Sequence, residues 1–286
     1  MNFQKAKLTP GLYFVGVPIG TARDVTLRAL DVLSSADVLA AEDTRSLRRL
    51  LDIHGVPLDG RPLIALHDHS GKVVIDKLIQ AINDGQSVAY ASEAGMPLIA
   101  DPGFELGRAA AEAKVEVTCA PGPSAVSTAL VVGGMPTDAF LFSGFLPNAR
   151  AGRCTALEAL RDIKATLVFY ESPKRLGAML SDASAVLGAN RAAVVCRELT
   201  KKFEEKRHGS LAELADYYGQ TKTKGEIVVL IDRPHLQNLK GIDLEADLIA
   251  ALGQHSMRDA VDLVAKSNDV PRRQVYQMAL ALSKEA

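Results

Sequence analysis

The chain has 286 residues, of which 48% are hydrophobic and 23% charged, and its formal net charge at pH 7 is −1. This length predicts two domains, and the composition predicts globular domains with enough apolar side chains to form a core in each. The small net charge excludes a polycationic coat but leaves a local basic face open.

No segment predicts a membrane span or a secretion signal. The longest apolar run, Ala125 to Met135, is interrupted by serine, threonine and glycine and falls short of the roughly 20 residues that cross a bilayer. The first ten residues lack an apolar stretch with a small-residue cleavage site. The three cysteines stand singly, which suits neither a disulfide framework nor a zinc site. We therefore expect a cytoplasmic protein.

Residues 1–120 alternate short β-rich runs with amphipathic stretches, the pattern of strand–helix units on a largely parallel sheet. The predicted strands are Leu12–Val17, Asp37–Ala41, Leu63–Leu66, Ser87–Ala91 and Val115–Cys119. The predicted helices are Asp24–Ser34, Ser46–His54, Lys72–Asn83 and Phe104–Ala113. This segment predicts an N-terminal α/β domain.

Glycine and proline are frequent between Pro121 and Pro147, where we place the domain junction, and residues 121–236 predict a second α/β domain. Its predicted strands are Ala165–Tyr170, Ala192–Arg197 and Glu226–Ile231, and its predicted helices are Lys174–Val186 and Leu211–Tyr217. The separated strands and a hairpin-like segment, Glu198–Gly209, indicate a mixed sheet.

The sequence pattern of residues 240–286 differs from that of the preceding segments and predicts mostly helix. The predicted helices are Leu244–Leu252, Arg258–Lys266 and Arg272–Leu282. A short polar turn between the last two is typical of a helix-turn-helix. Most such helix pairs are structural, but Arg272, Arg273 and Tyr276 at the start of the last helix keep a nucleic-acid contact open.

Basic residues gather in the second α/β segment, where Glu198, Glu204 and Glu205 dilute them. They are Lys174, Arg175, Arg197, Lys201, Lys202, Lys206, Arg207, Lys222 and Lys224. A solvated face is the ordinary interpretation of such a run, and phosphate binding needs other support.

Three turns rich in glycine and proline follow predicted strands, at the edge where ligands bind in open α/β sheets. They are Gly16–Gly20, Ser92–Gly103 and Pro121–Ala125. Glycine lets the backbone approach a ligand, and the helix that the third turn opens offers amides that suit a carboxylate or phosphate. We expect these turns to converge on one pocket. Within the second turn, Asp101 followed by Pro102 also predicts a helix N-cap.

Motifs of several other enzyme classes are absent from the sequence. No G-x-G-x-x-G follows the first strand and no G-x-x-x-x-G-K-[ST] occurs, which disfavours a nicotinamide oxidoreductase and a P-loop nucleotidase. No G-x-S-x-G occurs, which disfavours an α/β hydrolase.

Six motifs occur in a fixed order along the chain. They are Gly16-Val17-Pro18-Ile19-Gly20, Ala41-Glu42-Asp43-Thr44-Arg45, Ala65-Leu66-His67-Asp68-His69, the Ser92–Gly103 loop, Pro121-Gly122-Pro123-Ser124-Ala125 and Phe169-Tyr170-Glu171-Ser172. Together they resemble the ribosomal RNA small-subunit methyltransferase I family, a branch of the tetrapyrrole-methylase-like (class III) methyltransferases. The resemblance runs from about Gly11 to Ile231, and the helical tail is similar to the helix-turn-helix tail of that family. It implies two α/β domains with the cofactor in the cleft between them.

The resemblance implies methyl transfer from S-adenosylmethionine to the 2′-hydroxyl of a cytidine in the decoding region of small-subunit (16S) ribosomal RNA. It also implies a homodimer, with the ribosomal RNA or the 30S subunit as its partner. The sequence departs at Glu93 and Met96, where relatives usually have aspartate and threonine. Glu93 keeps a carboxylate on a longer stem, whereas Met96 lacks the hydroxyl.

The resemblance also implies a set of cofactor-binding residues. They are Pro18, Ser92, Glu93, Gly95, Met96, Pro97, Asp101, Gly103, Pro121, Gly122, Ser124, Ala125, Tyr170 and Glu171. Methyl transfer from a sulfonium needs alignment and exclusion of water and no metal, and a ribose hydroxyl also needs a group that relieves its proton. The candidate catalytic residues are Glu42, Asp43, Arg45, His67, Asp68 and Glu171.

Structural roles remain open for several of these residues. Asp43 and Arg45 suit an ion pair or a helix cap, although Arg45 also suits an RNA phosphate. Glu171 suits the first turn of a helix. Two other functions stay open as well: a methyltransferase of the same superfamily that acts on a tetrapyrrole or another small molecule, and a non-catalytic ribosome-assembly module that binds RNA. The tail and the Glu42–Arg45 motif favour RNA, and Met96 favours the non-catalytic module.

Overall fold

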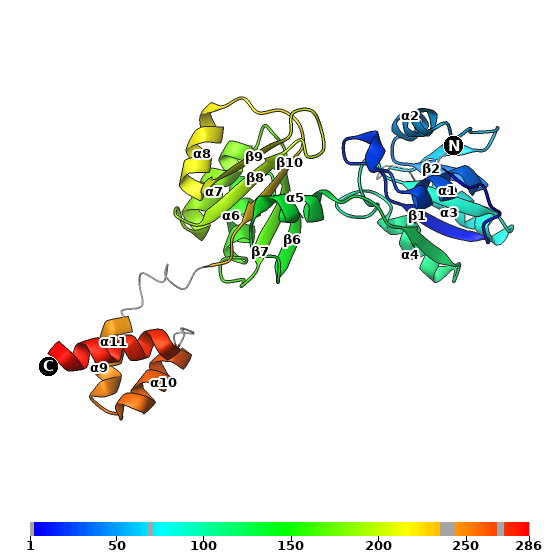
Figure 1. The fold of residues 1–286 in the computed structure, drawn as a ribbon. Coiled ribbons are helices and arrows are strands. Elements are labelled where there is room, and N and C mark those ends of the chain that lie inside the picture. The colour runs from blue at the N-terminus through cyan, green and yellow to red at the C-terminus, as the bar shows by residue number, and fades with distance from the viewer. Residues whose placement is uncertain (1–2, 68–70, 235–243, 268–271, 286) are drawn as a thin grey trace. The chain divides into compact units, whose positions relative to one another are not determined.

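The computed structural model describes residues 3–67, 71–234, 244–267 and 272–285. The chain divides into two compact units. The larger comprises Met1–Arg161 and Ala165–Asp232, and the smaller Asp162–Lys164 and Arg233–Ala286. The larger unit contains two β-sheets flanked by helices, and the smaller consists mainly of helices (Figure 1). Within the described ranges, no helix combines the length and apolar character that a membrane crossing needs.

The first sheet is parallel, with the strand order β3-β2-β4-β1-β5. Its strands are β1 (Gly11–Val15), β2 (Val38–Ala41), β3 (Leu63–Ala65), β4 (Ser87–Ala91) and β5 (Val117–Ala120). Every residue of β1, β2 and β4 is buried, as expected for central strands with helices on both faces. The predicted parallel sheet is confirmed.

Helices α1 and α2 pack on one face of this sheet, and α3 and α4 on the other. Their bounds are α1 (Leu27–Ser35), α2 (Thr44–His54), α3 (Lys72–Asn83) and α4 (Phe104–Glu112), and a short 3-10 helix, η1 (Ala22–Asp24), precedes α1. The predicted cap at Asp101 was wrong. Gly103 is the N-cap of α4, and its φ of 117° is a conformation that glycine adopts easily, so the helix begins later.

The second sheet is mixed, with the strand order β6-β7-β10-β8-β9. Its strands are β6 (Phe140–Phe145), β7 (Thr166–Glu171), β8 (Ala192–Arg197), β9 (Glu205–Ser210) and β10 (Ile227–Ile231). β6 and β7 are parallel and the other pairs antiparallel, which confirms the mixed sheet. The segment predicted to be hairpin-like contains all of β9 except Ser210, and β9 pairs with β8.

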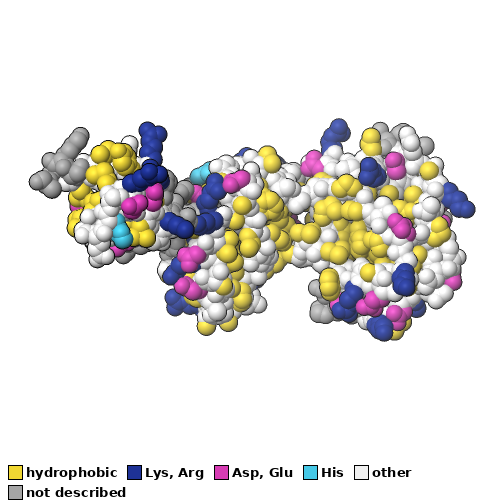
Figure 2. Space-filling view, turned by 90° about the horizontal axis from the view of Figure 1, so that it is seen from below, with side chains coloured by type: hydrophobic (Ala, Val, Ile, Leu, Met, Phe, Trp, Pro, Cys, Tyr) yellow, Lys and Arg dark blue, Asp and Glu magenta, His cyan; other side chains and the backbone are white. Residues whose placement is uncertain are grey.

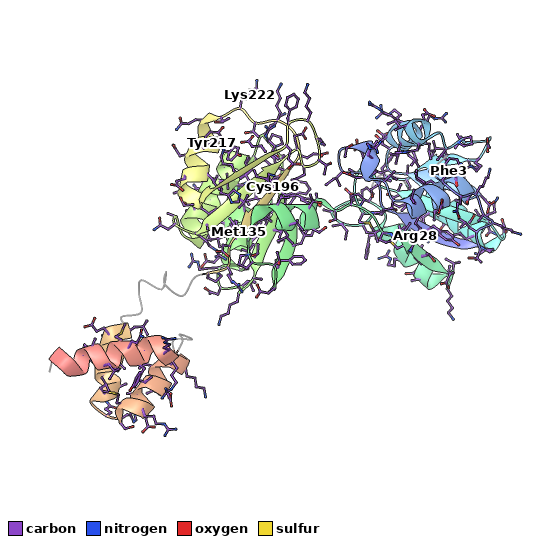
Figure 3. The ribbon with its side chains drawn as sticks, in the orientation of Figure 1. Phe3, Arg28, Met135, Cys196, Tyr217 and Lys222 are labelled. Carbon is purple, nitrogen blue, oxygen red and sulfur yellow. The ribbon has the colours of Figure 1, made fainter. Side chains whose placement is uncertain are left out.

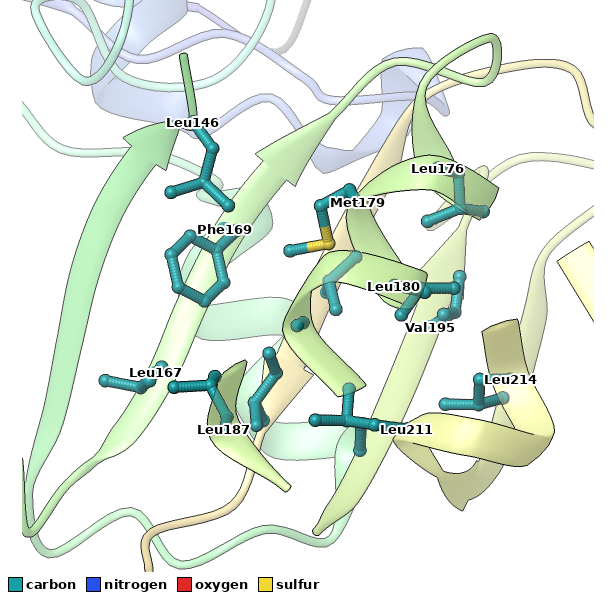
Figure 4. Close-up of a cluster of buried hydrophobic side chains, with 14 of the residues drawn as sticks. Leu146, Leu167, Phe169, Leu176, Met179, Leu180, Leu187, Val195, Leu211 and Leu214 are labelled. Atoms are coloured by element: carbon teal, nitrogen blue, oxygen red, sulfur yellow. The ribbon is translucent and has the colours of Figure 1, made fainter. Parts of the chain in front are cut away.

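Helix α5 (Ala125–Gly133) packs on one face of the second sheet. Three helices pack on the other face: α6 (Arg150–Glu158), α7 (Leu176–Leu187) and α8 (Leu211–Gln220). Figure 4 shows the core on that second face, where Phe169 of β7 lies with Met179 and Leu180 of α7 and Leu211 of α8. The capping box of Ser210 and Glu213 fixes the start of α8.

The smaller unit has its own hydrophobic core. It contains α9 (Leu244–Leu252), α10 (Met257–Ser267) and α11 (Arg272–Glu285), close to the predicted helices. Leu248, Val261, Val264 and Val275 are buried together. The described residues of this core all come from the three helices.

Candidate functional site

The sequence motifs of the first half meet at the carboxyl edge of the parallel sheet. The Gly16 amide donates to the Ala120 carbonyl at 2.9 Å, and the Glu42 amide donates to the Ala91 carbonyl at 3.1 Å. The Leu66 amide donates to the Ala41 carbonyl at 2.8 Å. These bonds connect neighbouring strand ends, so motifs that are far apart in sequence become adjacent.

The three glycine-bearing turns converge, as expected. A Cβ on Gly16 would lie 2.7 Å from the Gly122 amide nitrogen, and a Cβ on Gly122 would lie 2.9 Å from the Gly16 carbonyl carbon. Two backbone bonds of 2.9 and 3.1 Å join Val17 and Gly95. A side chain at Gly16 or Gly122 would therefore force the turns apart.

Met96 fills the space between two of these turns. Its Sδ accepts a hydrogen bond from the Gly122 amide at 3.2 Å and would lie 2.6 Å from a Cβ on Gly16. A thioether is a weak acceptor, so its main contribution here is packing. The departure from threonine thus has a structural role, and it depends on glycine at both neighbours.

The loop between β4 and α4 has an unusual backbone. Leu98 and Ala100 have φ values of 69° and 60°, and Gly95 has 75°. Left-handed conformations of non-glycine residues are uncommon and gather at functional sites. The carboxylate of Glu42 accepts from the Glu93 amide at 3.1 Å and so holds the start of this loop.

A cavity of about 350 Å³ lies between these turns and the edge of the second sheet. It is lined by Ile19, Ala94, Gly95, Met96, Ile99, Ala100, Asp101, Ser124, Ala125, Phe145, Tyr170, Glu171, Ser172, Pro173, Leu199, Gly225, Glu226, Ile227 and Val228. Three of these residues, Asp101, Glu171 and Glu226, carry carboxylates, and none of the described lining residues is a lysine, arginine or histidine. The cavity therefore favours a ligand with positive charge and apolar surface.

Glu171 ends β7 with a fully buried side chain. Its Oε1 accepts from the Ser172 amide at 2.7 Å and lies 3.3 Å from Arg175 Nε. Its Oε2 has no hydrogen-bond partner among the described residues. Because an unpartnered buried carboxylate oxygen is costly, a ligand that donates a hydrogen bond would satisfy it.

Tyr170 precedes Glu171 on the cavity wall. Burial raises its pKa to about 12, and the charges of Asp101 and Glu226 add to this effect. The phenol therefore stays protonated at neutral pH and can donate a hydrogen bond. Its ring packs edge-on against Phe142 and Phe145, with centroids 4.9 and 5.7 Å away.

The predicted site residues divide into two groups. Those that line the cavity are Gly95, Met96, Asp101, Ser124, Ala125, Tyr170 and Glu171. Those in the surrounding turns and strand ends, outside its lining, are Pro18, Glu42, Asp43, Arg45, His67, Ser92, Glu93, Pro97, Gly103, Pro121 and Gly122. His67, Asp101 and Gly103 line a second cavity of about 260 Å³. Asp68 lies outside the described residues.

Asp43 and Arg45 form an ion pair, and Asp43 also caps helix α2, so both of the structural roles that the sequence left open are present. The guanidinium donates to both Asp43 oxygens, at 3.1 and 2.8 Å, and the Arg45 amide donates to Oδ1 at 2.8 Å. These bonds lower the pKa of Asp43 to about 2, which makes it a weak base. The Arg45 side chain remains 91% exposed.

The second-sheet wall of the cavity was largely missed in the sequence. Gly225 and Glu226 precede β10, and Leu199 follows β8. β10 runs antiparallel to β7 and β8, so Ile227 at its start pairs with Glu171 and Arg197 at their ends. Ligand sites in parallel sheets lie at the carboxyl ends of strands, so the sequence does not predict a wall that is built from the start of a strand. No local pattern in the sequence marks this wall, because pairing between distant strands brings it to the cavity.

Two family models match the sequence. The model described as "Tetrapyrrole (Corrin/Porphyrin) Methylases" matches residues 11–215, and the "RsmI C-terminal HTH domain" matches residues 240–283. The first covers both sheets except the last strand, and the second covers the helical unit.

Curated relatives match almost the full length. "Ribosomal RNA small subunit methyltransferase I" of Mesorhizobium japonicum is 43% identical over 96% of this chain and 93% of that protein. The proteins of the same name from Halalkalibacterium halodurans and Escherichia coli O157:H7 are 38% and 39% identical. They cover 93% and 94% of this chain, and the match spans 93% and 94% of their own lengths.

Solved structures share the fold of the larger unit. A diphthine synthase has a TM-score of 0.60 at 16% identity, covering 77% of this chain and 89% of that one. A uroporphyrin-III C-methyltransferase from Thermus thermophilus, complexed with S-adenosylhomocysteine, has a TM-score of 0.56 at 16% identity, covering 78% and 97%. At such identities the likeness shows the fold alone.

Proposed function

Because this chain belongs to the ribosomal RNA small subunit methyltransferase I family, we propose that it methylates the ribose 2′-hydroxyl of a cytidine in the decoding region of 16S ribosomal RNA, with S-adenosylmethionine as the donor. The observation that carries this proposal is the acidic cavity at the convergence of the three glycine-bearing turns.

The residues of the cavity fit this cofactor. Its apolar walls suit an adenine, and the carboxylates of Asp101 and Glu226 suit the sulfonium and the ammonium. Ser124, the N-cap of α5, makes no side-chain capping bond, so first-turn amides and its hydroxyl suit the methionine carboxylate. We assign cofactor contact to the predicted residues that line the cavity other than Glu171, and a shaping role to Pro18, Ser92, Glu93, Pro97, Gly103, Pro121 and Gly122.

When bound, the cofactor supplies a methyl group on a sulfonium, which is a good leaving group. We propose that Glu171 accepts the proton of the ribose hydroxyl at Oε2, while Ser172 and Arg175 hold Oε1. The Tyr170 hydroxyl orients polar ligand groups as a donor. The surrounding apolar residues exclude water.

The other candidate catalytic residues receive supporting roles. Glu42 holds the loop that begins at Ser92 through its bond to the Glu93 amide. Asp43 orients Arg45, whose exposed guanidinium suits an RNA phosphate. We propose that His67, at the second cavity, contacts the acceptor nucleotide; Asp68 follows it in sequence.

We also propose that the three predicted segments have separate tasks. Residues 1–120 and 121–236 form the transfer site, and residues 240–286 help to bind RNA or the 30S subunit. Arg273 and Tyr276 support this role, because both are exposed at the start of α11. The expected location is the cytoplasm, where the ribosomal substrate is found.

A homodimer is the proposed assembly. Val131 and Phe140 are 82% and 50% exposed, and Figure 2 shows hydrophobic side chains at the surface of the larger unit. Exposed apolar patches mark interaction surfaces in soluble proteins, and a two-fold dimer is the commonest way to bury one.

Incubation with methyl-labelled S-adenosylmethionine tests the function. Parallel reactions contain isolated small subunits, deproteinised 16S RNA, or a tetrapyrrole. The proposal predicts label in the RNA, recovered as a 2′-O-methylated cytidine. Label in the tetrapyrrole would favour a small-molecule methyltransferase, and no label in any reaction would favour a non-catalytic module.

A further inference from the structure

The turn between β8 and β9 presents an exposed aromatic ring. Phe203 is 65% exposed, and the ammonium of Lys202 lies 5.6 Å from the centre of its ring. The same turn begins beside the cavity, because Leu199 belongs to the cavity wall. Phe203 therefore presents its ring to solvent four residues along the chain from the cavity wall.

The turn is held rigidly by its own hydrogen bonds. The Thr200 amide donates to Glu204 Oε2 at 2.8 Å, and the Glu204 amide donates to the Lys201 carbonyl at 3.1 Å. Glu198 and Thr200 have φ values of 52° and 62°, which non-glycine residues rarely adopt. These hydrogen bonds and backbone conformations define the shape of the turn, and this shape places Phe203 at the surface.

Neighbouring contacts fix the turn against the rest of the larger unit. Lys201 Nζ donates to Glu198 at 3.0 Å and to Glu226 at 2.5 Å, which ties the turn to the start of β10. Thr200 Oγ1 accepts from the Thr21 amide at 3.3 Å. A Cβ on Gly20 would lie 2.4 Å from that same oxygen, so the two segments pack closely. The ring of Phe203 thus has a defined place beside the cavity.

Most charges around the turn are paired, and the unpaired ones are positive. Lys206 pairs with Glu204 at 3.1 Å, and Arg207 pairs with Glu205 at 3.4 Å. Within the described part of the chain, no ion pair involves Lys202, Lys222 or Lys224.

The two exposed lysines after α8 lie near the turn. The carbonyl of Lys224 accepts from Arg197 Nη1 at 3.3 Å, which places that loop beside the end of β8. Figure 3 shows Lys222 on the same loop, after Tyr217 of α8. The surface around Phe203 therefore carries positive charge that is free to meet an anion.

We propose that Phe203, Lys202, Lys222 and Lys224 form a contact surface for single-stranded RNA beside the cofactor cavity. Phe203 stacks on a nucleobase, and the three lysines neutralise neighbouring phosphates. Unpaired bases are recognised by stacking on aromatic side chains with cations along the backbone, and the rigid ring and free cations match that chemistry. The inference rests on the proposed function, because it takes RNA as the substrate.

Substitutions of Phe203 test stacking in the full-length protein. Binding of a decoding-region fragment of 16S RNA is measured by fluorescence anisotropy. Phe203→Ala and Phe203→Leu should each weaken binding about 5- to 100-fold, because leucine keeps apolar size but lacks the aromatic face. Phe203→Trp should bind within about twofold of wild type, since stacking on a larger aromatic face is retained. S-adenosylhomocysteine affinity, measured by calorimetry, should remain unchanged in all three variants.

The lysines are tested by the salt dependence of the same binding. The double variant Lys222→Ala, Lys224→Ala should reduce the slope of log Kd against log salt by roughly 1 to 2. Lys77→Ala on α3, also an exposed lysine, is the matched control and should leave the slope unchanged.

Three results would overturn this inference. If wild type methylates RNA but Phe203→Ala keeps its RNA affinity and KM, the contact surface is wrong while the proposed function stands. If Phe203→Ala alters sedimentation but not RNA affinity, the surface belongs to a second copy of the chain. If wild type neither binds nor methylates RNA, both proposals fail.

Discussion

Arg175 Nε lies 3.3 Å from Glu171 Oε1, and the same guanidinium donates to the Leu146 carbonyl at 2.6 Å and to Asn148 Oδ1 at 2.5 Å. Arg175 therefore ties the end of β7 to the segment after β6. This leaves Glu171 with one oxygen held and one without a partner among the described residues. A carboxylate so fixed is prepared for a single ligand contact.

The first prediction concerns Glu171→Gln. The amide keeps the shape of the side chain but is a far weaker base, so kcat for RNA methylation should fall about 10²- to 10⁴-fold. S-adenosylhomocysteine affinity should change by less than about threefold, in contrast to kcat. Single-turnover kinetics and calorimetry measure the two quantities. An equal loss in both would assign Glu171 to cofactor binding.

Arg175→Lys tests whether positioning of Glu171 matters. Lysine keeps the charge but cannot bond Leu146, Asn148 and Glu171 together. We expect kcat to fall about tenfold while S-adenosylhomocysteine affinity changes little, because the carboxylate remains present but is less well held. Wild-type kcat would mean that the guanidinium fork serves only the fold.

The third prediction concerns the contact between the Gly16 and Gly122 turns. Gly122→Val should abolish measurable S-adenosylhomocysteine binding, because its side chain would push the Gly16 turn away. Gly219→Ala is the matched control, since a Cβ there meets nothing within 4 Å. Circular dichroism should show that both variants keep their helices. Wild-type affinity in Gly122→Val would remove this turn from the cofactor site.

Asp37 gives a prediction on pH and stability. Its Oδ2 accepts from the Ser87 hydroxyl at 2.7 Å and from the Ser87 amide at 2.8 Å, and these bonds lower the pKa of Asp37. A lowered folded-state pKa contributes stability above the unfolded value of about 3.9, and this stability is lost as pH falls through the folded-state value.

The variant Asp37→Ala should therefore lose about 1 kcal/mol at pH 7, a modest value because the carboxylate is largely exposed and screened. Urea unfolding of variant and wild type at pH 7, 5 and 3 measures the difference. It should persist from pH 7 to 5 and shrink by pH 3. A difference that does not depend on pH would show that the ionised carboxylate is not its source.

Deletion of residues 243–286 tests the helical unit. Its core is separate from those of the two sheets, so the remaining chain should fold and keep its S-adenosylhomocysteine affinity. Loss of the exposed Arg273 and Tyr276 should weaken RNA binding about tenfold or more, as measured by anisotropy at fixed salt. Unchanged RNA affinity would exclude the tail from RNA recognition.

Helices and strands with a continuous apolar run or a clear apolar period were predictable from the sequence, and those with neither were not. β4 and β8 were predicted to the residue because they are continuous buried runs. α6 was missed because its buried face includes a charged residue, Arg153, and therefore lacks a continuous apolar pattern in the sequence. Arg153 is buried because it pairs with Asp182 at 2.7 Å. β6 was missed because it lies at the sheet edge, half exposed, within the glycine- and proline-rich junction.

The candidate site was predictable on one side only. The turns after parallel strands were found because topology places all such ends at one edge, as at Gly95 and Ser124. Glu226 was missed because antiparallel pairing brings the beginning of β10 to the same place, and this pairing has no local signature. The contact between Met96 and Gly122 could not be predicted either, since no spacing rule joins residues 26 positions apart.

A crystal structure of the protein with S-adenosylhomocysteine tests the central claim most directly. We expect the ligand in the cavity of about 350 Å³, in contact with the turns at Gly95 and Ser124. Ligand bound away from these turns, or a saturated crystal with this cavity empty, would contradict it.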